Sequence, residues 1–148
     1  MAFRGHYEYT LDTKNRLTIP AKFRAELAGG VVLAKSLDTC ISIWPLAGWE
    51  EFTERAIKSR DPFSAEARRL QRYFHAGSFD AQLDGAGRIM LPQPLLRHVQ
   101  LRKDVVVVGN YDTIEVWDRD AWRTYEREID ETANETAQRL ARGGQLEA

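Results

Sequence analysis

The pattern Leu11-Asp12-Thr13-Lys14-Asn15-Arg16-Leu17-Thr18-Ile19-Pro20 returns 72 positions later as Leu83-Asp84-Gly85-Ala86-Gly87-Arg88-Ile89-Met90-Leu91-Pro92. Each copy contains an aspartate, an arginine four positions later, a largely apolar triplet and a proline. After a slip of one residue the match continues at an offset of 73, which pairs Trp44 with Trp117 and Trp49 with Trp122. An internal repeat at a fixed period predicts two copies of one structural unit.

Both copies predict the same order of elements, of the type β-α-β-β. Alternating residues before each aspartate, at 7–11 and 79–83, are typical of a strand, and the triplets after each turn predict a second one. Pro20 and Pro92 suit the first turn of a short helix, where the missing N–H of proline costs nothing. Two further strands are expected in each copy, at 31–34 and 40–44 in the first and at 105–108 and 114–117 in the second.

A unit of fewer than ~50 residues buries too little surface to be stable alone. We therefore expect the two units to complete one pseudo-symmetric barrel with peripheral helices, a mainly β fold of the α+β type. Four segments are predicted: residues 6–53 as the first unit, 54–77 as a helical linker, 78–122 as the second unit and 123–148 as a C-terminal helix and tail. Pro62 and the candidate N-cap Ser64 divide the linker into a helical hairpin, and Gly143-Gly144 is expected to end a long helix over 117–140.

The composition predicts a soluble, intracellular globular unit. Of the 148 residues 43% are hydrophobic and the net charge is −1, values that do not fit a disordered chain. No apolar run approaches the ~18 residues of a membrane span. The single cysteine, Cys40, excludes a disulfide framework, and the three histidines lack the spacing of metal ligands, so no metal or cofactor is predicted.

The charge is unevenly distributed. Residues 115–148 carry nine acidic and five basic side chains, a net of −4, which leaves +3 for residues 1–114. Such an asymmetry can accompany the binding of polyanions, but it is more typical of a helix with a solvated acidic face.

The aspartates of the repeated turn have a structural interpretation. An aspartate side chain accepts hydrogen bonds from backbone N–H groups ahead of it and closes a turn. Asn15 and Gly87 occupy equivalent positions and are residue types that tolerate a positive φ. We therefore assign turn-structuring roles to Asp12, Asp84, Gly85 and Gly87.

Two hypotheses remain open for the arginines of the turns. Arg16 and Arg88 either form exposed cross-turn ion pairs, each worth ~0–1 kcal/mol, or present guanidinium donors to phosphates or guanine edges. The first turn also contains the polar side chains of Thr13, Lys14 and Asn15. We therefore expect the first turn to contribute more than the second to the recognition of a nucleic acid. Upstream, Arg4 is expected to add a phosphate contact.

Enzymatic alternatives have weak support in the sequence. Paired aspartates in pseudo-symmetric halves resemble an aspartic-protease dyad, but Lys14 replaces the small residue needed and the arginines would hold both carboxylates ionised. The segment Gly85-Ala86-Gly87 lacks the third glycine of a dinucleotide fingerprint and precedes a strand. No enzyme is predicted.

The chain resembles the MraZ family of bacterial transcription factors over about residues 1–127. The resemblance is carried by the paired Asp-x-x-x-Arg turns with the Ile-Pro and Leu-Pro that follow them, by Phe3-Arg4-Gly5 and by residues 69–77. It implies a tandem pair of SpoVT-AbrB-like swapped-hairpin units that assemble into rings, commonly octamers. It also implies a cytoplasmic, nucleoid-associated protein that binds direct repeats upstream of its own division and cell-wall operon, usually as a repressor.

The resemblance also assigns roles to residues. Double-stranded DNA is the implied partner, and the candidate contacts are Arg4, Thr13, Lys14, Asn15, Arg16 and Arg88. Ala86 between two glycines leaves little in the second turn to contact bases. Two other functions stay open: a scaffold ring for which DNA is incidental, and an AbrB-type antitoxin-like DNA binder with a toxin partner.

Overall fold

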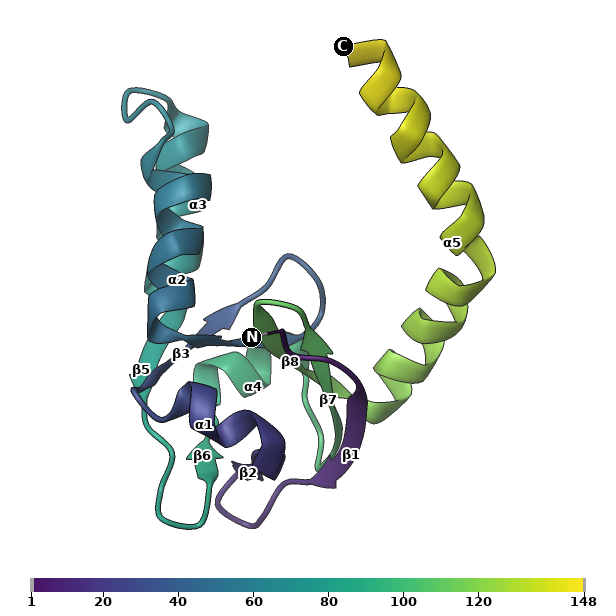
Figure 1. The fold of residues 1–148 in the computed structure, drawn as a ribbon. Helices are drawn as coiled ribbons and strands as arrows, with labels where there is room; N and C mark the ends of the chain where they lie inside the picture. Colours follow the sequence, from purple (N-terminus) through teal and green to yellow (C-terminus); the bar gives the residue numbers. More distant parts are fainter. Residues whose placement is uncertain (1, 148) are drawn as a thin grey trace.

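A computed structural model describes residues 2–147, and side chains as far as Gly143. The strands are β1 (His6–Thr10), β2 (Arg16–Thr18), β3 (Val31–Lys35), β4 (Ile41–Pro45), β5 (Ser78–Ala81), β6 (Arg88–Met90), β7 (Asp104–Asn110) and β8 (Thr113–Asp118). The helices are η1 (Ala21–Phe23), α1 (Arg24–Leu27), α2 (Leu46–Thr53), the π-helical segment η2 (Glu54–Lys58), α3 (Ala65–Ala76), α4 (Gln93–Val99) and α5 (Arg119–Glu147). Figure 1 shows both turns of the repeat at one end of the molecule and α2, α3 and α5 projecting from the other.

The strands form a six-stranded antiparallel sheet in the order β1-β7-β8-β4-β3-β5 and a two-stranded ribbon of β2 and β6. The first strand of each repeat pairs with the other repeat, β1 with β7 and β5 with β3. This exchange agrees with the swapped hairpins that the resemblance implies, and the mainly β class with peripheral helices is confirmed. Because β1 and β5 are the edges of the sheet, the pairing among residues 2–147 does not show a closed barrel.

The register of two strand pairs reveals the pseudo-two-fold symmetry. In the β4–β8 pair Ser42 lies opposite Glu115, its own equivalent in the second repeat. In the ribbon Leu17 lies opposite Ile89, again its own equivalent. A residue that pairs with its own equivalent lies at the symmetry axis, so one axis passes through both the sheet and the ribbon.

The two faces of the sheet are covered differently. Leu33 and Val107 face the main core, which the fully buried Leu17 and Ile89 of the ribbon close from the other side. Alternate residues on the opposite face pack under two aromatic clusters, because successive strand side chains point to opposite faces. The four tryptophans that the repeat pairs, Trp44, Trp49, Trp117 and Trp122, are buried there.

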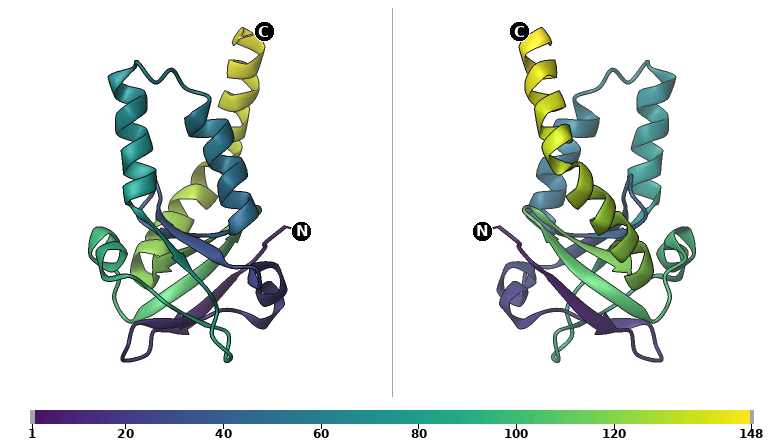
Figure 2. Two further views of the ribbon diagram at one scale, coloured as in Figure 1. Left: turned by 90° about the vertical axis from the view of Figure 1, so that its left-hand side faces the viewer. Right: turned by 90° about the vertical axis from the view of Figure 1, so that its right-hand side faces the viewer.

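The linker folds as the predicted hairpin. α2 and η2 lead outward and α3 returns (Figure 2). The side chain of Ser64 accepts a hydrogen bond from the backbone N–H of Ala67 at 3.3 Å and so caps α3. Caps of this kind stabilise a helix by about 1 kcal/mol.

The expected bounds of the last helix were wrong at both ends. Trp117 lies in β8, and α5 begins only at Arg119, after Asp118 accepts a hydrogen bond from the N–H of Ala121. The helix then continues through Gly143-Gly144 to Glu147. A glycine ends a helix when it adopts the left-handed conformation. Inside a helix, a glycine is less favourable than an alanine by only about 1 kcal/mol, so α5 can continue through it.

Within residues 2–147, no helix is long and apolar enough to cross a lipid bilayer. The same residues contain no group of three or more histidine, cysteine or acidic side chains placed to hold a metal ion.

Candidate nucleic-acid interface

The two Asp-x-x-x-Arg turns have the same geometry. Oδ1 of Asp12 accepts from the backbone N–H groups of Lys14 and Arg16, both at 2.9 Å, and Oδ2 accepts from Nε of Arg16 at 2.7 Å. Oδ1 of Asp84 accepts from the N–H groups of Ala86 and Arg88, both at 2.9 Å, and Oδ2 from Nε of Arg88 at 2.9 Å. Each aspartate therefore closes its turn and orients the arginine that follows.

These hydrogen bonds lower the pKa of both carboxyl groups. The backbone N–H of Arg16 is the largest cause at Asp12 and lowers its pKa to about 2. The pKa of Asp84 is also lowered, chiefly by the backbone N–H of Arg88. Both aspartates are ionised at neutral pH and hold the arginine side chains in place as charged acceptors.

The turns also connect the two repeats. Asn15 and Gly87 have φ of 58° and 75°, the left-handed conformation expected from the sequence. Their carbonyl oxygens accept hydrogen bonds across the ribbon, Asn15 from the N–H of Leu91 at 3.0 Å and Gly87 from the N–H of Ile19 at 2.9 Å. The position of each turn is thus fixed by the other repeat. Gly85 has no positive φ, and a Cβ atom there would meet open space.

The ribbon exposes a face of four side chains between the turns. Because Leu17 and Ile89 point into the core, their neighbours along β2 and β6 point outward. Arg16 lies opposite Met90, and Thr18 lies opposite Arg88. We call this set of four the ribbon face: Arg16, Thr18, Arg88 and Met90. Met90 is 59% exposed, an unusual position for a large apolar side chain.

The terminal nitrogens of both arginines on the ribbon face are free. Nε of Arg16 and Nε of Arg88 bond their aspartates, and within the described side chains no hydrogen bond or ion pair involves their Nη atoms. An arginine held at Nε presents its two Nη groups as a planar pair of donors. This pair matches the two acceptors of a guanine edge or of a phosphate.

Further cations border the ribbon face. Lys14 is exposed at the tip of the first turn. Nζ of Lys103 donates to the carbonyl oxygen of Asp12 at 3.0 Å and to Oδ1 of Asn15 at 3.1 Å. On the other side Nε of Arg24 donates to the carbonyl oxygen of Ile19 at 2.9 Å. With Asp12 and Asp84 neutralised by their arginines, these cations leave this end of the molecule basic.

The structure brings most of the predicted contact residues together. Thr13, Lys14, Asn15 and Arg16 share the first turn, and the ribbon places Arg88 beside them. Arg4 lies apart: it precedes β1, whose other end leads to the turn, and lines a groove with Arg55 and Tyr111. The structure therefore does not bring Arg4 to the ribbon face.

Sequence reasoning did not identify Thr18, Met90 and Lys103. Period-two alternation in Arg-Leu-Thr and Arg-Ile-Met could have placed Thr18 and Met90 beside the arginines, since both triplets begin with the residue that leaves the turn. Lys103 is separated from Asp12 by 91 positions, and no local pattern connects them.

The fold and these turns define a class: tandem β units that exchange hairpins and present two Asp–Arg turns on one ribbon. The family model described as "MraZ protein, putative antitoxin-like" matches the chain twice, over residues 2–73 and 74–143. The chain belongs to the MraZ family.

Curated relatives match most of the chain. It is 40% identical over 138 residues to the transcriptional regulator MraZ of Moorella thermoacetica, covering 93% of this chain and 96% of the relative. It is 37% identical over 136 residues to the protein of the same name from Caldanaerobacter subterraneus subsp. tengcongensis, covering 92% and 94%. The transcriptional regulator MraZ of Limosilactobacillus fermentum is 39% identical over 124 residues, covering 84% and 86%.

Proposed function

We propose that this chain is a sequence-specific DNA-binding transcriptional regulator that acts as a repressor. Its proposed targets are direct repeats upstream of its own division and cell-wall operon. The observation that carries the proposal is the ribbon face, where two arginines are each held at Nε by an aspartate and offer free Nη groups outward. The names of the relatives support a role in transcription.

The dimensions and chemistry of the ribbon suit the major groove of DNA. That groove admits a two-stranded β-ribbon, and its base edges carry distinct sets of donors, acceptors and methyl groups. Arg16 would bind O6 and N7 of a guanine with its two Nη groups, while Lys14 and Lys103 would neutralise phosphates at the rim. Arg88 would act second, because Ala86 leaves its turn without a cation at the tip.

Assembly is a further part of the proposal. One ribbon face contacts few bases and phosphates, so a single subunit would bind weakly. Subunits joined in a ring, proposed to be an octamer, would engage several repeats at once and gain affinity through effective concentration. Such a protein would act in the cytoplasm, at the nucleoid.

Fluorescence anisotropy tests this function. The protein is titrated into the DNA upstream of its own gene and into a scrambled duplex, at low and high salt, as wild type and as Arg16→Ala. We expect binding that prefers the upstream DNA, weakens with salt and is weaker in the variant than in wild type.

Other outcomes would reject the proposal in distinct ways. Equal binding to both duplexes would leave only a nonspecific polyanion binder. An intact assembly that binds neither duplex would favour the scaffold. Specific binding that requires a second, toxin-like protein would favour the antitoxin-like alternative.

A further inference from the structure

The two repeats carry matching aromatic clusters on the outer face of the sheet. Trp44 and Phe52 stack at 4.8 Å between ring centroids, and their equivalents Trp117 and Tyr125 stack at 4.9 Å. Trp49 and Trp122 complete the two clusters at corresponding positions. The beginning of α5 is therefore the structural equivalent of α2.

The helix α2 has a partner helix. Phe74 of α3 packs edge-on against Phe52, with ring centroids 5.4 Å apart, and His75 packs on Trp49 at 5.9 Å. Under α3, Thr53 and Ile57 are buried. Figure 2 shows α2 and α3 as the two arms of one hairpin.

No second helix packs on α5 within the part of the chain that the structure describes, and the helix runs alone in Figure 1. The equivalents of Thr53, Ala56 and Ile57 on α5 are Glu126, Ile129 and Asp130. Ile129 and Asp130 are exposed, as are almost all described side chains beyond Glu126. We call this set the open face of α5: Glu126, Ile129, Asp130 and the adjacent Glu131. Most helical stability in proteins comes from the packing of one face against a partner, and most of α5 has no such partner within the described residues.

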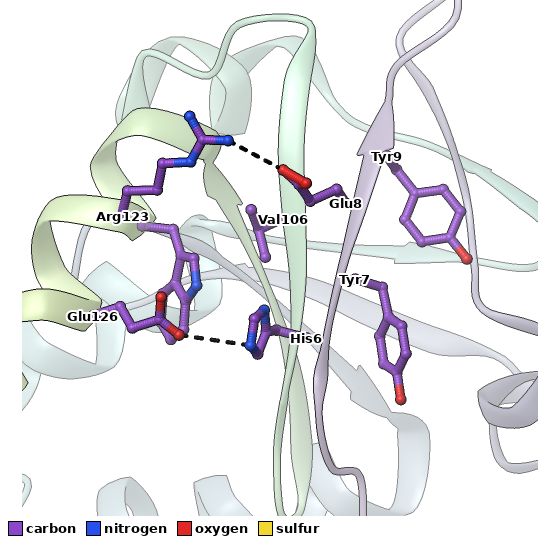
Figure 3. Close-up of a pocket in the computed structure, with 8 residues that line it drawn as sticks. His6, Tyr7, Glu8, Tyr9, Val106, Arg123 and Glu126 are labelled. Atoms are coloured by element: carbon purple, nitrogen blue, oxygen red, sulfur yellow. Dashed lines mark hydrogen bonds and ion pairs between the residues drawn. The ribbon is translucent and has the colours of Figure 1, made fainter. Parts of the chain in front are cut away.

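A groove of about 680 Å³ lies at the base of the open face, between β1 and α5. Figure 3 shows His6 and Glu8 of β1 pointing toward Glu126 and Arg123 of α5, with the ion pairs His6–Glu126 at 3.6 Å and Glu8–Arg123 at 3.4 Å. Trp122 also lines the groove, and its buried indole N–H has no acceptor among the described residues.

The charges on α3 and α5 are complementary. Between residues 126 and 135, α5 carries five acidic side chains and one basic one. α3 carries three arginines and one glutamate. Along α3 the side chains of Arg69, Leu70 and Arg72 are exposed. Within the described side chains neither of these two arginines, nor Asp130 or Glu131, forms an ion pair.

We infer that the α3 helix of a second copy of this chain covers the open face of α5. Arg69 and Arg72 of one copy pair with Asp130 and Glu131 of the next, and Leu70 lies against Ile129. The contact joins two different surfaces, so each copy can bind one neighbour through α3 and another through α5. Such head-to-tail contacts close into a ring or extend as a filament. This contact rests on the ring assembly of the proposed function and would form the interface between its subunits.

The test measures mass by light scattering during size exclusion. Wild type is expected to run as a multiple of the 17.0 kDa chain. Arg69→Glu with Arg72→Glu, and separately Asp130→Arg with Glu131→Arg, should each reduce the mass to that of one folded chain. The control, Arg4→Glu with Arg97→Glu, changes two other exposed arginines and should keep the wild-type mass.

Mixing the two monomeric variants gives the decisive result. The acidic α3 of one variant is then complementary in charge to the basic α5 of the other. The native α3 and α5 that remain are also complementary, so assembly should return. A monomeric wild type, variants that keep the wild-type mass, or a mixture that stays monomeric would each overturn the inference. If only the α5 variant loses assembly, two α5 helices pair with each other instead.

Circular dichroism establishes that each variant is folded. DNA binding is not part of the readout, so failure here is distinct from failure of the proposed function.

Discussion

We expect single arginines to determine how strongly the proposed interface binds DNA. Arg16→Ala removes a bidentate donor pair, so we expect the Kd for the upstream DNA to rise about 5- to 150-fold, from about 1–3 kcal/mol of lost interaction. Arg88→Ala should cost less, because its turn has no counterpart of Lys14. Arg60→Ala, at the far tip of the helical hairpin, serves as the control and should leave the Kd unchanged. Equal losses for Arg16→Ala and Arg88→Ala would contradict this ranking of the turns.

Met90 provides a test of base recognition that does not involve charge. An exposed apolar side chain between two arginines suits the C5-methyl group of thymine. We expect replacement of one thymine by uracil in the repeat to weaken binding about fourfold, from ~0.8 kcal/mol for one buried methyl group. Met90→Ala should bind thymine and uracil duplexes equally well. If no thymine position distinguishes wild type from this variant, Met90 does not contact the base.

Asp12 and Asp84 are expected to make the thermal stability of the protein depend on pH. The pKa of Asp12 falls from 3.8 to about 2 on folding, and that of Asp84 is also lowered. A lowered pKa contributes stability that is fully present above pH ~4 and is lost as the pH falls toward 2. We therefore expect the Tm of wild type to fall across this window. Asp12→Asn should have a lower Tm at neutral pH and a smaller further loss in acid. Parallel pH profiles of the two proteins would contradict the role of Asp12.

At the scale of the elements, the second turn offers a matched pair of glycines. Gly87 has φ of 75°, and an added Cβ there would overlap the guanidinium group of Arg24, whereas Gly85 has neither constraint. Gly87→Ala should lower the free energy of unfolding by about 1–2 kcal/mol, the cost of a left-handed residue with a side chain. Gly85→Ala should change it by less than about 0.5 kcal/mol. Urea denaturation measures both, and equal effects would show that the turn is not held in this conformation.

The repeat predicted individual elements better than their pairing. Alternation and the two prolines located the strands around each turn, because those signals are local. The exchange of β1 and β5 between repeats depends on long-range register, which no local pattern specifies, and it entered only through the resemblance to MraZ. The end of α5 was predicted wrongly at Gly143-Gly144. A glycine pair ends a helix only where the backbone after it leaves the helical conformation, and here it stays helical to Glu147.

The candidate site was also predicted only in part, because local sequence patterns identify neighbours along the chain but not contacts that the fold creates. The first turn is contiguous in sequence, so its four polar residues could be grouped without a structure. Arg4 is near them in sequence, but β1 separates it from the turn. Lys103 is distant in sequence and reaches Asp12 only through the fold.

At the scale of the whole molecule, the ribbon face and the basic α3 helix lie at opposite ends (Figure 1). Both ends are basic, so charge alone does not decide which one binds DNA. Three exposed side chains report on the separate surfaces: Met90 on the ribbon face, Phe63 at the tip of the helical hairpin and Tyr111 beside Arg4. Their exposed fractions are 59%, 90% and 73%, so all three are accessible to a solution oxidant.

Hydroxyl-radical footprinting with and without the upstream DNA tests the central claim most directly. If the ribbon face binds DNA, the duplex will protect Met90 from oxidation and leave Phe63 and Tyr111 as reactive as before. Protection of Phe63 with no change at Met90 would place the DNA on the helical hairpin and contradict the account.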